Sequence, residues 1–134
     1  MKNFILLTGL IATLLACEPS KKAELQTLKD EVIAIHDEVM PKMGELRKTR
    51  MTLEALADSL MESDSTRATM FGSLASDISN ANEGMRQWMR AFEPEFEGTE
   101  EERMKYFKEQ KVAVQKVKED MNGSLAKGKE ALKD

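Results

Sequence analysis

The sequence predicts an all-α fold: an elongated antiparallel three-helix bundle, in up-down-up order, with coiled-coil-like packing. Apolar residues recur at alternating spacings of three and four along long segments of the 134-residue chain. That spacing is typical of a helix with one buried face. Two short polar segments separate these stretches, and short connections make sequential helices antiparallel neighbours.

The first predicted helix carries an unbroken heptad series, formed by Leu25, Val32, Val39, Leu46, Leu53 and Leu60. Pro41 interrupts its middle, because proline lacks the amide that would bond to the carbonyl of Asp37. We therefore expect a kink between residues 37 and 44, and two helices with a break there are the alternative. A heptad series of this length also fits a self-associating coiled coil, although three stripes meeting within a monomer is the preferred interpretation.

The second and third helices are predicted from the polar segments that precede them. Residues 62–66 offer several N-caps, and Glu93 with Pro94 should end the second helix. Thr99 and Glu102 have the spacing of a capping box at the start of the third. Its final turns contain Gly123 and Gly128, which are expected to weaken the end of that helix. The apolar positions are Phe71, Leu74, Ile78, Ala81, Met85, Trp88 and Phe92 in the second helix, and Met104, Phe107, Val114, Val117, Met121 and Leu125 in the third.

Methionine, histidine and tryptophan are predicted to gather at one level of the bundle. A reversal about Asp64 would bring Met40 opposite Trp88, and Met43 opposite Met85. A second reversal about Phe96 would bring Met104 opposite Trp88 as well. Thioethers and imidazole suit soft monovalent metals, so the sequence suggests a Cu(I) or Ag(I) site. Its candidate ligands are His36, Met40, Met43, Met85 and Met89, with Trp88 as a cation-π cap and Met104 as a marginal member.

Ordinary packing is the competing interpretation of this group. Methionine forms helices well and fills irregular space in cores, and a tryptophan at an apolar heptad position is usually a core residue. The donor set resembles that of periplasmic copper and silver chaperones in residue types only.

The first seventeen residues indicate export. Lys2 precedes an apolar run from Phe4 to Leu15 that is too short to span a bilayer. The sequence Leu14-Leu15-Ala16-Cys17 resembles the lipobox of bacterial lipoproteins. The alternative is an ordinary cleaved signal with a free thiol at Cys17. We therefore expect a signal peptide over residues 1–16, a lipidated N-terminus and linker over 17–22, and a helical domain over 23–134.

This resemblance implies a membrane-anchored protein of the bacterial cell envelope, with acyl chains such as palmitate on Cys17. Glu18 after the cysteine favours the outer membrane over the inner. The chain also looks like uncharacterised small helical lipoproteins sometimes labelled viral A-type inclusion protein, a resemblance that implies no activity. The expected role is an interaction or structural module for an unidentified envelope protein, and the alternative is a soft-metal carrier or buffer.

Charge and motif content argue against two other classes of function. The chain has 20 basic and 24 acidic residues and a formal net charge of −4, and nucleic-acid binding needs a basic stripe. It contains one histidine, one cysteine and no phosphate-binding loop or nucleophile motif. We therefore expect neither a nucleic-acid partner nor an enzyme.

Overall fold

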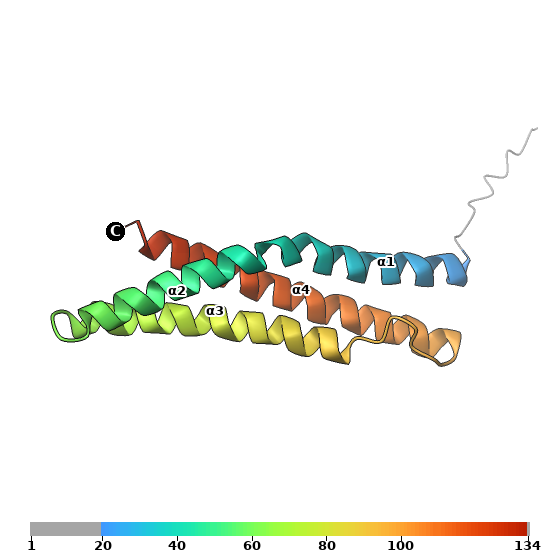
Figure 1. Cartoon of the computed structure of the whole chain (residues 1–134). Coiled ribbons are helices and arrows are strands. Elements are labelled where there is room, and N and C mark those ends of the chain that lie inside the picture. Colours follow the sequence, from blue (N-terminus) through green and yellow to red (C-terminus); the bar gives the residue numbers. More distant parts are fainter. Residues whose placement is uncertain (1–19, 134) are drawn as a thin grey trace, which may run out of the picture.

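The computed structural model describes residues 20–133, so the predicted signal peptide and the lipidation residue Cys17 lie outside the described residues. Figure 1 shows α1 and α2 following one another along a rod, α3 returning beside them, and α4 running again in the direction of α1. This arrangement confirms the all-α, antiparallel three-helix bundle. The elements are α1 (Lys21–Val39), the 3-10 helix η1 (Met40–Lys42), α2 (Met43–Leu60), α3 (Ser65–Ala91) and α4 (Glu100–Ala131). Among residues 20–133, no helix has the length and apolar character needed to cross a bilayer.

The bend between α1 and α2 falls where Pro41 predicts it. The amide of Met40 still donates to the carbonyl of His36. Proline has no amide to donate, and the amide of Met43 donates to the carbonyl of Met40, three residues back. The chain therefore passes through one 3-10 turn without leaving helical geometry. As a result, α1 packs mainly against α4, whereas α2 packs mainly against α3.

The helix ends follow the predicted capping chemistry. Asp64 accepts a hydrogen bond from the amide of Arg67 at 3.0 Å and starts α3. Thr99 and Glu102 form a complete capping box at the start of α4, with contacts of 2.8 and 3.2 Å. Ser20 caps α1, which begins at Lys21, two residues before the predicted start of the domain.

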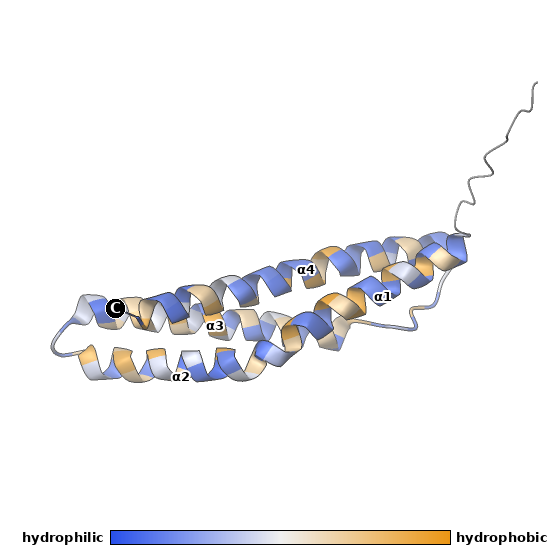
Figure 2. Ribbon diagram, turned by 90° about the horizontal axis from the view of Figure 1, so that it is seen from above, coloured by the Kyte–Doolittle hydropathy of each residue, from blue (hydrophilic) through white to orange (hydrophobic). Residues whose placement is uncertain are grey.

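The core follows the heptad positions closely. All six residues of the first heptad series except Leu60 are buried. Two polar residues that lie between the members of that series contact specific partners and do not interrupt the core. Lys42 donates to the amide oxygen of Asn122 at 2.7 Å, and Thr49 is buried against α4. Figure 2 shows the same alternation of apolar and polar residues along each ribbon. The apolar core comprises Leu25, Val32, Val39, Leu46, Leu53, Ala57, Ala68, Phe71, Ala75, Ile78, Ala81, Met85, Trp88, Phe107, Val114, Met121 and Leu125.

The expectation that two glycines weaken the end of the third helix is wrong for Gly128. Helix α4 continues through both glycines to Ala131. Gly128 is buried where α2, α3 and α4 approach one another. Its missing side chain is what allows that approach, and burial of the neighbouring surfaces offsets the low helix propensity of glycine.

A series of ion pairs connects α1 and the start of α2 to α4. Four glutamates spaced seven residues apart face lysines of α4. Because α1 and α2 run in the same direction as α4, the partners are 80 or 84 residues apart in sequence. This pairing favours one register of α4 over its neighbours. The pairs are Glu24 with Lys108 at 3.9 Å, Glu31 with Lys111 at 2.8 Å, Glu38 with Lys118 at 2.6 Å and Glu45 with Lys129 at 2.6 Å.

Candidate functional site

Three of the predicted site residues meet where α1 faces the end of α3. The Nε2 atom of His36 lies 3.4 Å from the Sδ atom of Met89. The imidazole ring also lies beside the indole of Trp88, with 5.7 Å between ring centroids. The predicted reversal about Asp64 therefore brings the histidine and the tryptophan together.

Asp37 determines which nitrogen of His36 faces the thioether. Its carboxylate lies 2.8 Å from Nδ1 of the imidazole. An Nδ1–H that donates to this carboxylate leaves the lone pair of Nε2 directed at the Met89 sulfur. In that tautomer, two electron-pair donors face one another at the surface of the bundle.

Aromatic residues hold Trp88 in place. Its indole stacks on Phe92 at a centroid distance of 4.8 Å, and Phe92 in turn packs beside Tyr106 and Phe107. The Tyr106 hydroxyl accepts a hydrogen bond from the amide of Glu93 at 2.7 Å, which ties α4 to the end of α3. These contacts fix the position of the Trp88 indole beside His36. Among residues 20–133, the buried indole N–H has no hydrogen-bond partner.

The other predicted ligands are divided between the core and a second surface. Met85 is completely buried, and Met40 is half-buried against the same core. Met43 instead lines a groove between α2 and α3 together with Arg86. Met43 therefore lies near the level of Met85 along the rod, as expected. Its side chain, however, lies beside Arg86 and not beside His36.

Met104 does not lie opposite Trp88, and that expectation is corrected. It lines a hollow with Lys21 and Glu24 near the start of α1. The second reversal is centred later than Phe96, because α4 begins only at Glu100 after a non-helical segment that runs on past the end of α3 (Figure 1). An extended segment advances about twice as far per residue as a helix. The start of α4 is therefore displaced along the rod.

Sequence reasoning missed two residues that shape this site. Asp37 was not among the predicted site residues, although its position next to the only histidine of the sequence was a usable signal. Tyr106 was not singled out, and its pairing with α3 depends on the register of α4. Within the described part of the chain, no three histidine, cysteine, aspartate or glutamate side chains form a metal-binding group. Any metal here would therefore depend on thioether ligands.

The chain matches no known protein family, and no similar curated protein or solved structure was found.

Proposed function

We propose that this chain is a lipoprotein of the bacterial cell envelope, tethered through Cys17, whose helical bundle binds another envelope protein. The role is one of binding, not of catalysis. The lipobox-like sequence supports the anchor, and the distribution of exposed methionines supports the interaction. The proposed membrane is the outer membrane, because Glu18 follows the cysteine.

The observation that carries the binding proposal is where methionine side chains are most exposed; the most exposed apolar residue of another type, Val112 at 72 %, lies on α4. The three most exposed methionines are Met51, Met61 and Met70, with 53, 59 and 44 % of their surface accessible. All three lie in the half of the rod formed by α2 and the beginning of α3, away from residue 20 (Figure 1). Methionine is flexible and polarizable, and it is common on adaptable protein-binding surfaces. A tether at one end would leave the other end for a partner.

Position-specific photo-cross-linking in intact cells tests this role. A cross-linker replacing Met61, in the turn after α2, should give a discrete adduct. The same group at Glu109, exposed near the opposite end, is the matched control and should not. Equal adducts at both positions, or none at Met61, would contradict the proposal. An adduct of twice the chain mass would identify a second copy and favour the self-associating alternative.

A second candidate function, soft-metal binding, is favoured by the contact between His36 and Met89. The two donor atoms lie 3.4 Å apart. With metal–nitrogen and metal–sulfur distances of about 2.0 and 2.3 Å, as for zinc, an ion bound to both would have a nitrogen–metal–sulfur angle of roughly 105°. That angle suits trigonal or tetrahedral coordination. The Trp88 ring lies close enough to His36 for a cation-π contact with the same ion.

Cu(I) titration against a competing chelator, followed by Trp88 fluorescence, tests this candidate. The unaltered protein should compete for Cu(I) and its emission should fall. Met89→Leu should abolish both effects, whereas Met51→Leu, which alters an exposed methionine far from His36, should change neither. An unaltered protein that does not compete would exclude the candidate.

A further inference from the structure

A groove of about 620 Å³ lies between α2 and α3, beyond the site around His36. Residues 43, 47 and 50 form one stripe of α2, and residues 79, 82 and 86 form the facing stripe of α3. Gly44 lies on the α2 side of the groove. A Cβ atom placed on that glycine would meet no other atom within 4 Å.

Three of the six arginines in the chain line this groove: Arg47, Arg50 and Arg86. No carboxylate is among the lining residues, in a protein whose net charge is negative. Arg50 pairs with Glu54 at the rim. Among residues 20–133, Arg47 has no ion-pair partner. The groove therefore presents three guanidinium groups, of which Arg47 is unpaired among the described residues, whereas Arg50 and Arg86 each contact a carboxylate of their own helix.

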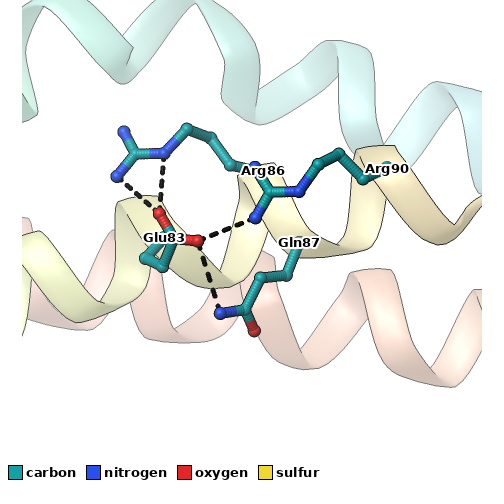
Figure 3. A network of polar contacts seen from close by, with 4 residues as sticks. All are labelled: Glu83, Arg86, Gln87 and Arg90. Carbon is teal, nitrogen blue, oxygen red and sulfur yellow. Dashed lines mark hydrogen bonds and ion pairs between the residues drawn. The ribbon is translucent and has the colours of Figure 1, made fainter.

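Arg86 is held in position by its own helix. Its guanidinium contacts the carboxylate of Glu83 through Nε and Nη2 at 2.9 and 2.8 Å, and Arg90 reaches the same carboxylate (Figure 3). The hydrogen bond from Arg86 holds the pKa of Glu83 below its ordinary value. A guanidinium group has five N–H donors. When one edge of the group is bonded to a carboxylate, the remaining N–H donors stay available for a ligand.

Asn82 provides a second, independent indication of a ligand. It lines the groove and is only 7 % exposed, and its Oδ1 atom accepts no hydrogen bond from any residue of the described chain. A buried amide oxygen without a partner is unfavourable. This oxygen has almost no accessible surface, so a rotation of the Asn82 side chain is needed to bring it to a hydroxyl or amine group in the groove.

We propose that this groove binds a phosphomonoester that carries a hydroxyl group, through Arg47, Arg50, Arg86 and Asn82. A phosphomonoester has close to two negative charges and three acceptor oxygens, which suits three guanidinium groups better than the two oxygens of a carboxylate. The hydroxyl donates to Asn82. The volume falls within the range of small-molecule sites, and the site depends neither on the lipid anchor nor on the His36–Met89 contact.

The test is an NMR titration with glycerol 3-phosphate, following the Asn82 side-chain amide and the backbone amides of Gly44 and Ser79. These signals should shift together and saturate at millimolar ligand. Ethyl phosphate, which lacks the hydroxyl, should bind more weakly. Asn82→Ala should remove that difference between the two ligands. Vesicles containing lysophosphatidate, which keeps one free hydroxyl group on its glycerol, form a second arm: shifts with the soluble ester alone assign a free ligand, and shifts with vesicles alone assign a lipid headgroup.

Two variants and one control separate this site from nonspecific charge. Arg47→Gln should weaken binding about tenfold or more, the change expected on losing one hydrogen bond to a charged group. Gly44→Met fills the groove without altering charge and should also abolish binding, while its higher helix propensity keeps the protein folded. Lys105→Gln removes the same charge near the other end of the rod and should leave binding unchanged. No shift with either ligand source, or equal losses in Arg47→Gln and Lys105→Gln, would overturn the proposal.

Discussion

Gly128 and Thr49 are in such close contact that a Cβ atom on the glycine would lie 2.9 Å from Thr49 Cγ2. The same atom would lie 3.1 Å from a methyl group of Ile78 and 3.2 Å from one of Leu53. All three neighbours are buried, so none has free space to move into.

Gly128→Ala should therefore destabilise the protein, by about 1 kcal/mol or more, because overpacking exceeds the gain in helix propensity. Gly123→Ala is the matched control, since a Cβ atom there meets nothing within 4 Å. It should stabilise the protein by about 0.5–1 kcal/mol. Urea unfolding measures both. Adding Thr49→Ser, which deletes the closest methyl, should recover part of the loss. Equal effects of the two glycine substitutions would contradict the packing described here.

The Glu38–Lys118 pair should make stability depend on pH. A hydrogen bond from Lys118 lowers the pKa of Glu38 below its ordinary value of 4.5. A carboxyl group with a lower pKa in the folded state adds stability above its unfolded pKa, and that contribution is lost as the pH falls through the folded value. Lys129 lowers the pKa of Glu45 in the same way. The free energy of unfolding should therefore fall on acidification below about pH 4.5.

NMR titration of the Glu38 carboxyl group tests the cause of that shift. Lys118→Met should return the pKa toward its ordinary value. Lys116→Met should leave it unchanged, because Lys116 pairs with Asp120 on its own helix. An unchanged pKa in Lys118→Met would show that the pair does not form in solution.

If the second candidate function is correct, Asp37 acts as a positioning residue for metal binding. Asp37→Asn should lower the affinity for Cu(I) by about 10- to 100-fold, the usual effect of removing a carboxylate that orients a ligating histidine. The thermal midpoint should change little, because Asp37 is exposed. Asp30→Asn, an equal change of charge on the same helix, should have no effect on binding. Equal affinities of the two variants for Cu(I) would show that Asp37 does not position His36 for metal binding.

The heptad pattern predicts the helices and their buried faces because burial of an apolar stripe dominates the packing of long helices. Leu46 and Leu53 are buried as predicted, although Thr49 between them is polar. The bend at Pro41 follows from local chemistry, since one missing amide forces a change in hydrogen bonding. Both kinds of feature depend on residues close together in sequence.

Relative placement of the helices was harder to predict from the sequence. Met104 was misplaced because the length of a non-helical connection along the rod depends on its conformation. Gly128 was interpreted by its propensity, whereas its role depends on Thr49 in another helix. The ion pairs of the glutamates at positions 31 and 38 were not predicted, although their seven-residue spacing matches that of lysines in α4. Such contacts follow from the register of the bundle, which no single helix specifies.

The mass of the mature protein, extracted from membranes, tests the central claim of an envelope lipoprotein most directly. The account predicts a chain that begins at Cys17 and carries acyl chains on that residue, and Cys17→Ser should prevent both cleavage and acylation. A membrane-extracted chain that retains Met1, or that has an unmodified thiol at Cys17, would contradict it.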